Sequence, residues 1–259
     1  QIFGYDIQRM RDAAVMVEQS GADLLDINCG CPAPKVVKKG GGCELMRQPE
    51  HLAKILKAVR SAVSIPLTLK MRSGWDSQSL NALAIAKMAE SEGIEAVAVH
   101  GRTRVQLYRG LADWSIVKEI ADNVSIPVLG SGDVVDRESA LARLANGASG
   151  LLVGRAALSN PFVFSEIVSG QKLSFDKPES MMIGVIERYI QLLLEEFPAK
   201  SCVGKIKQLV SQFVKGYSWR KDICRAESLD EQVNILKALK DNFENFDTFK
   251  LDSAQCQTL

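Results

Sequence analysis

Asp26-Ile27-Asn28-Cys29-Gly30-Cys31-Pro32 closes an apolar run that begins at Ala22. An apolar run of about six residues that stops at glycine and proline is typical of a buried strand that leads into a loop. Parallel α/β folds place their chemistry at the carboxyl ends of such strands. The stretch therefore predicts an α/β fold in which Cys31 is a reactive thiol beside a bound cofactor.

Strand and helix signals alternate on both sides of this stretch. Apolar, strand-like runs cover residues 1–4, 22–28, 67–72, 95–100, 128–133 and 149–153, and helical periodicity covers 7–20, 49–63, 79–92, 114–122 and 136–146. Strict alternation predicts a parallel sheet that is covered on both faces. Six strand signals suit a doubly wound sheet, whereas a (β/α)8 barrel needs eight strands, so the count alone leaves both architectures open.

The pattern changes after Pro161. Residues 170–178 have the composition of a linker, and helical periodicity alone follows, over 180–197, 199–215 and 230–246. We expect an α/β domain at 1–172 and an all-α domain at 175–259. Residues 200–225 of the second domain hold seven Lys or Arg and one acid, with Tyr217 and Trp219 between them. A solvated helix face and a phosphate-binding face are both open interpretations of this basic segment.

The composition narrows the class of protein. The chain is 46% hydrophobic and 24% charged with a net charge of +1, which is ordinary for a globular protein and shows no overall bias toward nucleic acid. No apolar run approaches the roughly 20 residues of a membrane helix, and we expect no membrane partner. Six cysteines without a secretion signal predict reduced thiols in a cytoplasmic protein. Because the Cys-x-Cys spacing and two histidines do not suit zinc, we expect no metal.

Cys31 and the next two strand ends carry the candidate chemistry. Lys70 and Arg72 alternate with apolar residues on one short strand, so they must meet an anion or lie at the end of the sheet. Such cations favour a thiolate and make Cys31 usable as an acid near neutral pH, although a buried inert cysteine is the alternative. His100 ends the following strand at the same edge, where structural and functional roles are both open.

The last two strands end in small and charged residues, Gly130-Ser131-Gly132-Asp133 and Gly154-Arg155. Backbone N–H groups of such loops can approach a phosphate closely, and an arginine adds charge-assisted hydrogen bonds. In a barrel these two loops form the usual phosphate site. Their pairing predicts a phosphorylated cofactor or substrate.

Several motifs taken together resemble one enzyme family. They are Asn28-x-Gly30-Cys31-Pro32-Ala33-x-Lys35-x-Val37, Gly42-x-x-Leu45-Met46, Thr68-Leu69-Lys70-x-Arg72-x-Gly74-Trp75, His100-Gly101-Arg102-Thr103, Gly132-Asp133, Gly154-Arg155-Ala156 and Pro161-x-x-Phe164. The combination resembles the bacterial tRNA-dihydrouridine synthases, in their DusB-like branch. The resemblance implies an FMN-dependent oxidoreductase that reduces a tRNA uridine to 5,6-dihydrouridine with NADPH. It also implies a TIM barrel followed by a helical tRNA-binding domain.

The resemblance further implies roles for particular residues. Cys31 matches the general acid that gives a proton to uracil C5 while the flavin gives a hydride to C6. Cofactor contacts are expected at Gln1, Lys70, His100, Ser131, Gly132, Asp133, Gly154 and Arg155. Contacts to the uracil or the RNA backbone are expected at Asn28, Arg72, Arg102, Arg104, Lys205 and Lys207. An RNA-gripping domain suits this chemistry because the target base must leave its stack.

The sequence departs from the family pattern in several places, including Cys29, where the family usually has a bulkier apolar residue, and Ile206-Lys207-Gln208, where it usually has Arg-Lys-His. The family usually has Asn where this chain has Ser131, and it has two more strands before the one at residues 1–4. We therefore expect barrel strands three to eight in this chain and the first two before Gln1. Two other functions stay open: an FMN-dependent TIM-barrel oxidoreductase acting on a small molecule, similar to the dihydroorotate dehydrogenases, and a non-catalytic RNA-binding protein. We expect a monomer.

Overall fold

The computed structural model describes residues 1–175 and 178–242, in two compact units that meet between Gly154 and Arg155. The strands of the first unit are β1 (Leu25–Cys29), β2 (Leu67–Arg72), β3 (Ala96–His100), β4 (Val128–Ser131) and β5 (Gly150–Leu152). Its helices are α1 (Ile7–Gln19), α2 (Pro34–Val37), the 3-10 helix η1 (Gly42–Arg47), α3 (Pro49–Arg60), α4 (Ala82–Ser91), α5 (Ser115–Ala121) and α6 (Arg137–Leu144). The second unit contains α7 (Arg155–Ser159), α8 (Val163–Ser169), α9 (Pro178–Glu196), α10 (Ala199–Phe213), α11 (Arg220–Arg225) and α12 (Leu229–Asn242).

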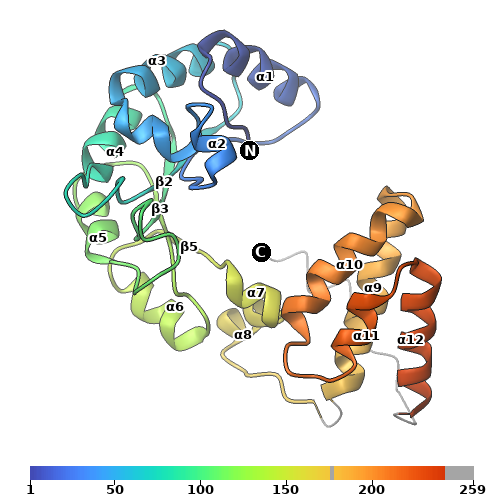
Figure 1. Cartoon of the computed structure of the whole chain (residues 1–259). Coiled ribbons are helices and arrows are strands. Elements are labelled where there is room, and N and C mark those ends of the chain that lie inside the picture. Colours follow the sequence, from blue (N-terminus) through green and yellow to red (C-terminus); the bar gives the residue numbers. More distant parts are fainter. Residues whose placement is uncertain (176–177, 243–259) are drawn as a thin grey trace. The chain divides into compact units, whose positions relative to one another are not determined.

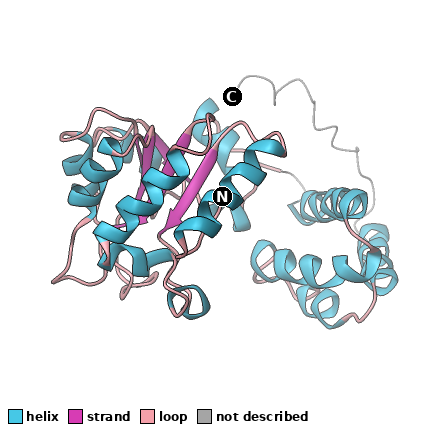
Figure 2. Cartoon of the chain, turned by 90° about the horizontal axis from the view of Figure 1, so that it is seen from above, coloured by secondary structure: helices cyan, strands magenta, loops and turns pink. Residues whose placement is uncertain are grey.

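The strands form one parallel sheet whose spatial order follows the sequence, β1-β2-β3-β4-β5. Helices α3, α4, α5 and α6 follow one another along the outer side of the strands (Figure 1). Figure 2 shows the strands as a single layer with helices beside it. A doubly wound sheet reverses its strand order at a switch point. The described residues show no such reversal, which excludes the doubly wound alternative for this part of the chain.

The segment at residues 1–4 pairs with β1 at one residue only. Ile2 forms a parallel bridge with Ile27, through hydrogen bonds from Ile2 N to Asp26 O and from Asn28 N to Ile2 O, both 2.9 Å long. The chain then turns away, because Asp6 begins α1 by accepting a hydrogen bond from Arg9 N at 2.8 Å. The expected strand is therefore a single bridge at the edge of the sheet.

The two faces of the sheet differ in polarity. Along β1 and β2, alternate residues are fully buried, among them Leu25, Ile27, Leu67, Leu69 and Met71. Burial of one such side chain contributes about 1.5–3 kcal/mol to folding. The residues between them are partly exposed and polar, namely Asp26, Asn28, Thr68 and Lys70. Along these two strands every second side chain thus carries a polar group, as the alternation of Lys70 and Arg72 with apolar residues predicts.

Most helix boundaries follow the local signals in the sequence. α6 begins with a capping box, in which Asp136 and Ser139 satisfy each other's backbone N–H groups. The helix expected from residue 79 begins instead at Ala82. Residues 74–80 form a loop that is closed by an antiparallel bridge between Gly74 and Leu80. The loop delays the helix because its backbone N–H groups are satisfied within the loop.

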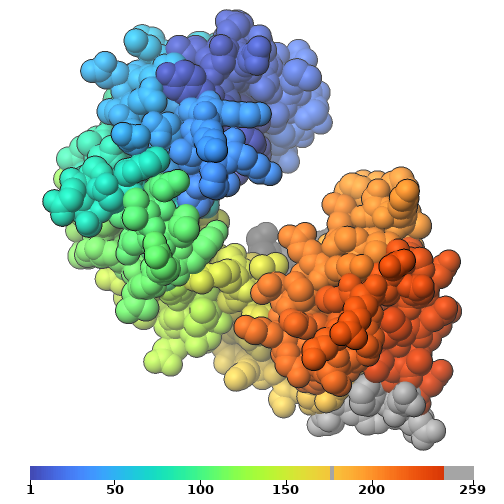
Figure 3. Space-filling view, in the orientation of Figure 1, coloured from blue at the N-terminus to red at the C-terminus, as the bar shows by residue number. Residues whose placement is uncertain are grey.

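The second unit is helical throughout its described residues. A core of apolar side chains joins α9, α10, α11 and α12, and these helices form a compact body (Figure 3). The expected helices at 180–197 and 199–215 agree with α9 and α10, while residues 243–246 of the third lie outside the described residues. The unit begins at Arg155 rather than near residue 175, because α7 packs against α10. Nowhere in residues 1–175 and 178–242 does a helix have the length and apolar character needed to span a membrane.

Candidate functional site at the strand ends

The carboxyl ends of the strands lie along one edge of the sheet. The register pairs Asn28 with Lys70, Arg72 with His100, and His100 with Ser131. Five residues predicted from separate motifs are therefore neighbours on adjacent strands. Parallel strands place their carboxyl ends together, which is why motifs far apart in the sequence meet here.

The loop that carries Cys31 is held by side chains from three segments. Asn28 Oδ1 accepts hydrogen bonds from the backbone N–H groups of Gly30 (3.1 Å) and Cys31 (2.8 Å). Asn28 Nδ2 donates to Gln1 Oε1 at 2.8 Å, and Arg72 Nε donates to Gly30 O at 3.1 Å. The side chains of Asn28 and Arg72 thus fix the position of Cys31 relative to β1 and β2.

Cys31 differs from the two cysteines beside it. Cys29 and Cys43 are fully buried, and burial raises the pKa of both thiols, that of Cys43 to about 12. Cys43 Sγ donates a hydrogen bond to Gly30 O at 3.0 Å, and Cys43 N donates to Cys31 O at 3.1 Å. Cys31 is only half-buried. Cys29 and Cys43 are therefore structural thiols, and Cys31 is the accessible one; the part of the chain that the structure describes holds no His, Cys, Asp or Glu cluster suited to a metal ion.

Iodoacetamide is expected to label Cys31 at least about tenfold faster than Cys29 or Cys43, because buried neutral thiols react slowly. Brief labelling of the native full chain followed by peptide mass mapping measures the three rates. Labelling of the unfolded chain in guanidinium gives the control, in which the three cysteines should react alike. Native labelling of Cys43 at the rate of Cys31 would contradict the assignment.

Lys70 is a cation on the polar face of β2 and pairs with no other residue in the described part of the chain. Burial is the main reason that its pKa is lowered, and Arg72 lowers it further, while Asp26 acts in the opposite direction. Within the described residues no group forms a hydrogen bond to the Lys70 ammonium, and Asp26 instead accepts one from Thr68 Oγ1 at 2.8 Å. A largely buried cation without a partner favours an anionic or oxygen-rich ligand.

The guanidinium groups of Arg72 and Arg102 are occupied by the protein itself. Arg72 Nη1 donates to the carbonyl oxygens of Thr103 and Leu107, both at 2.8 Å, and Arg102 Nη2 forms an ion pair with Asp133 at 2.7 Å. Arg102 is 2% exposed, so its side chain offers no surface to an RNA. Both arginines hold the loop after β3 in place.

Arg104 lies in a different setting. Its guanidinium stacks on Trp75 at 4.8 Å from the ring centroid, and Arg47 stacks on the same ring at 4.7 Å. Arg104 Nε is buried and has no hydrogen-bond partner among the described residues. The sequence reasoning missed Arg47 and did not interpret Trp75; the signal was the tryptophan directly after the Lys-x-Arg-x-Gly motif. Cation–π stacking leaves guanidinium edges available to phosphate oxygens.

The loop after β4 is shaped by packing as well as by backbone freedom. A Cβ on Gly130 would lie 2.1 Å from the Trp114 ring, and Trp114 Nε1 donates to Gly132 O at 3.0 Å. Gly132 and Asp133 have φ values of 121° and 55°, which lie in the region that favours glycine. The Asp133 carboxylate is engaged by Arg102 and by Ala112 N (2.8 Å). These bonds make Asp133 an anchor of the loop. A direct contact between Asp133 and a phosphate is not expected, because a carboxylate and a phosphate are both negatively charged.

Gly154 and Arg155 fall on either side of the division between the units. Gly154 follows β5 at the end of the first unit, and a Cβ there would meet no atom within 4 Å. Arg155 is the first residue of α7 in the second unit. The open space around Gly154 agrees with a site that a ligand could approach.

The basic segment of the second unit is not one continuous helix. α10 ends at Phe213, and α11 begins at Arg220 after a turn in which Gly216 has a φ of 108°. Trp219 belongs to the hydrophobic core and Tyr217 packs against that core, so neither aromatic lies on an exposed basic face. Residues after a glycine with positive φ cannot continue an α-helix, and the turn directs Trp219 inward.

Lys205 and Lys207 lie on different sides of α10. Both are half-buried, and they flank the fully buried Ile206. Residues two apart on an α-helix point roughly 200° apart. Lys205 Nζ also sits over the Phe197 ring at 4.3 Å. The exposed cations of the segment are Lys200, Lys215, Lys221 and Arg225.

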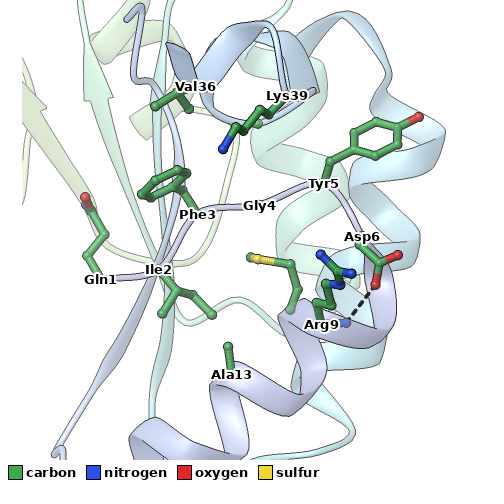
Figure 4. A pocket seen from close by; sticks show the side chains of 12 residues that line it. Gln1, Ile2, Phe3, Gly4, Tyr5, Asp6, Arg9, Ala13, Val36 and Lys39 are labelled. Atoms are coloured by element: carbon green, nitrogen blue, oxygen red, sulfur yellow. Dashed lines mark hydrogen bonds between the residues drawn. The ribbon is translucent and has the colours of Figure 1, made fainter.

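A cavity of about 600 Å³ lies beside the N-terminal segment of the first unit. Figure 4 shows Phe3 on the same side as Val36 and Lys39, and Ile2 on the side of Ala13. Of the predicted site residues only Gln1 lines it. The cavity therefore lies at the sheet edge next to Gln1, and Cys31 is not among the residues that line it.

Low pH is expected to destabilise the first unit through His100. Burial and the cations Arg72, Lys70 and Arg102 lower the pKa of His100 from 6.5 to about 3, against the opposing effect of Asp133. Between pH 6.5 and about 3 the unfolded chain takes up a proton at His100 that the folded chain does not, so stability falls as pH falls, by at most about 1.4 kcal/mol per pH unit. The difference in Tm between pH 7 and pH 5 should be smaller in His100→Gln than in the wild type. An equal difference would contradict the buried, neutral state of His100.

The first unit is a parallel α/β sheet whose strand order follows the sequence, with a thiol, cations and a histidine at its strand ends. Enzymes with parallel α/β sheets keep their active sites at this edge. The family model for dihydrouridine synthases matches residues 1–245, and the chain belongs to this family. The chain is 36% identical over 250 residues to tRNA-dihydrouridine synthase B of Vibrio cholerae, which covers 93% of this chain and 78% of that protein. It is 37% identical over 255 residues to the protein of the same name from Vibrio vulnificus (95% and 78%) and 49% identical over 168 residues to that from Pseudomonas syringae (64% and 50%).

Proposed function

We propose that this protein is a tRNA-dihydrouridine synthase, which reduces the C5=C6 bond of a tRNA uridine with FMN as cofactor and NADPH as reductant. One observation carries the proposal: Cys31, the accessible thiol, is fixed by Asn28 and Arg72 at a strand end next to the unpaired cation Lys70. In a chain of the dihydrouridine synthase family, this arrangement offers an acid beside a place for an anionic or carbonyl-rich ligand.

For the first unit we propose a closed barrel. The sheet has two free edges within residues 1–154, at the bridge of Ile2 and at β5. Polar side chains on one face of β1 and β2 suit the interior of a barrel that holds a cofactor at its mouth. Unpaired strand edges are rarely left open in parallel sheets, which favours closure of this sheet into a barrel.

The residues at the strand ends fit a flavin nucleotide. Lys70 supplies a cation, and His100 and Ser131 supply donors on adjacent strands, with Gln1 beside Asn28. Gly132 and Gly154 carry no side chain that would shield the backbone from a phosphate. We propose that Asp133 acts by shaping the loop that carries Gly132.

The chemistry of the residues follows from these positions. A bound flavin would supply the hydride that uracil C6 receives. Cys31 Sγ–H gives its proton to C5, so that the double bond gains one hydride and one proton and a thiolate remains. Lys70 and Arg72 lie near enough to stabilise negative charge at this edge, and the hydrogen bonds to Asn28 hold the Cys31 backbone during proton transfer.

For the substrate we propose a tRNA whose target base is flipped out of its stack. Arg104 and Arg47, stacked on Trp75, are candidates for contacts to the RNA backbone near the reacting base. The exposed cations of α10 and α11 are candidates for other phosphate contacts. A cytoplasmic location and a monomeric state both stay predictions. Size-exclusion chromatography tests the monomeric state.

Lys70→Met is expected to weaken FMN binding while leaving the flavin-free protein at least as stable as the wild type. The flavin loses a charge-assisted contact, which typically contributes about 1.5–3 kcal/mol, or roughly ten- to hundredfold in affinity. The folded chain meanwhile loses a buried, unpaired charge. Fluorescence titration with FMN and a thermal melt measure the two effects, with exposed Lys57→Met as the control. Unchanged FMN affinity in Lys70→Met would remove Lys70 from the cofactor site.

Flavin titration of the full chain tests the proposed function at its first step. A yellow complex with FMN, followed by NADPH-dependent formation of dihydrouridine in tRNA, is the expected result. A flavin-bound protein that reduces a small molecule without residues 175–259 would favour the small-molecule oxidoreductase instead. Binding of tRNA that is unchanged in Cys31→Ala, with no dihydrouridine from either version, would favour a non-catalytic RNA-binding protein.

A further inference from the structure

His100 is almost buried and touches a group that can only donate hydrogen bonds. The residue is 9% exposed at the end of β3. Its Nε2 lies 3.4 Å from Nη1 of Arg102, and Arg102 is itself 2% exposed. A guanidinium carries N–H donors and no acceptor, so His100 Nε2 must be the acceptor in this contact. The imidazole is then neutral, and its proton resides on Nδ1.

Arg102 is braced in the orientation that this contact requires. Its Nη2 bonds both carboxylate oxygens of Asp133 at 2.7 Å and Gly110 O at 2.5 Å, and its Nε donates to Arg109 O at 3.3 Å. Asp133 also accepts from Ala112 N at 2.8 Å. Every nitrogen of the guanidinium is therefore engaged, and none can turn away from His100 without breaking another bond.

The His100 ring is also fixed from the side of the β4 loop. A Cβ on Gly132 would lie 3.1 Å from Cδ2 and 3.2 Å from Nε2 of His100, so the Nε2 edge of the ring packs against this glycine. The opposite edge carries Nδ1. In the part of the chain that the structure describes, no group forms a hydrogen bond with Nδ1, and it is not sealed from its surroundings. An N–H donor is thus left over at the strand ends.

We propose that Arg102, braced by Asp133, is a positioning residue that holds His100 as a neutral imidazole with its proton on Nδ1, so that Nδ1–H donates to an oxygen of the ligand bound at the strand ends. The ligand oxygen is a phosphate or ring-carbonyl oxygen. Its assignment to a flavin nucleotide rests on the proposed function, whereas the position of the proton does not. A neutral His100 also avoids repulsion from Lys70, Arg72 and Arg102, the three cations that already lie near it at this edge.

The proton position can be measured by two-bond ¹H–¹⁵N NMR on the ¹⁵N-labelled full chain, which has only two histidines. The spectrum of His100→Asn assigns the signals. We expect His100 to show an unprotonated Nε2 and a protonated Nδ1 from pH 5.5 to 8. A protonated Nε2 in the wild type overturns the proposal, and this readout needs neither flavin nor a second variant that folds.

The role of Arg102 is tested by Arg102→Met, which keeps a long side chain without the donor. The Nδ1–H form should lose its dominance, with a protonated Nε2 becoming visible. If removal of one member of the ion pair unfolds the chain, the pair Arg102→Met with Asp133→Leu removes both charges at once. An unchanged Nδ1–H population in a folded variant would show that Arg102 does not fix the proton.

The donor itself is tested with two substitutions that mimic the two ring nitrogens. The Asn amide nitrogen occupies the place of Nδ1, and the Gln amide nitrogen reaches the place of Nε2. FMN affinity should fall less than about threefold in His100→Asn and at least about tenfold in His100→Gln. The reverse order overturns the donor role. If the wild type binds no flavin, the proposed function fails, and the NMR result still decides the position of the proton.

Discussion

Replacement of Cys31 by alanine is expected to lower the rate of uridine reduction by about 10²–10⁴-fold, with FMN still bound. The loss is that of a positioned general acid, because Cys31 is the accessible thiol of its loop while Cys29 and Cys43 are buried. FMN retention is expected because Lys70, His100 and Ser131 are unaltered. Single-turnover oxidation of the reduced, flavin-loaded full chain by tRNA measures the chemical step without NADPH.

The control is Cys224→Ala, which removes the half-buried thiol of α11. It should leave the rate unchanged. Cys31→Ser adds a second comparison, since a hydroxyl is a much weaker acid than a thiol and should restore little activity. A rate in Cys31→Ala equal to that of the wild type would remove Cys31 from the mechanism.

Lys221→Glu combined with Arg225→Glu is expected to weaken tRNA binding by at least about tenfold and to flatten its salt dependence. Both side chains are exposed and lie four residues apart on one side of α11. Each phosphate contact contributes roughly 0.7–0.9 to the slope of log K against log salt concentration, so the loss of two contacts should reduce the slope by roughly 1.4–1.8. Fluorescence anisotropy with labelled tRNA at four salt concentrations gives both quantities.

Two matched variants sharpen this test. Lys205→Glu with Lys207→Glu should change the slope by roughly 0.7–0.9, because lysines on opposite sides of Ile206 cannot both face one strand of RNA. Lys237→Glu, exposed on α12 and outside the basic segment, should leave the slope unchanged. Equal slopes for all three variants would contradict an RNA-binding face on α10 and α11.

Features set by local sequence were predictable. The run before Cys31 became β1, the loop followed at Gly30, and Asp6 and Asp136 capped the helices that they precede. These features depend on residues within one or two turns of each other. The single bridge at Ile2 was harder, because only the position of α1 shows that pairing stops there.

Features set by contacts between distant segments were not predictable. The resemblance implied that Arg102 contacts the uracil or the RNA backbone, yet Arg102 is buried and pairs with Asp133, which lies in the loop after the next strand. Trp219 was placed on a surface because its neighbours in the sequence are basic, yet it completes the core of the helical unit. Burial of a single side chain depends on how helices pack, and a sequence pattern of a few residues does not contain that information.

The central claim is tested most directly by mapping dihydrouridine in tRNA from a strain that lacks the gene. We predict that one or more dihydrouridine positions revert to uridine, that the native gene restores them, and that a version with Cys31→Ala does not. A dihydrouridine map that is unchanged by loss of the gene would contradict the account.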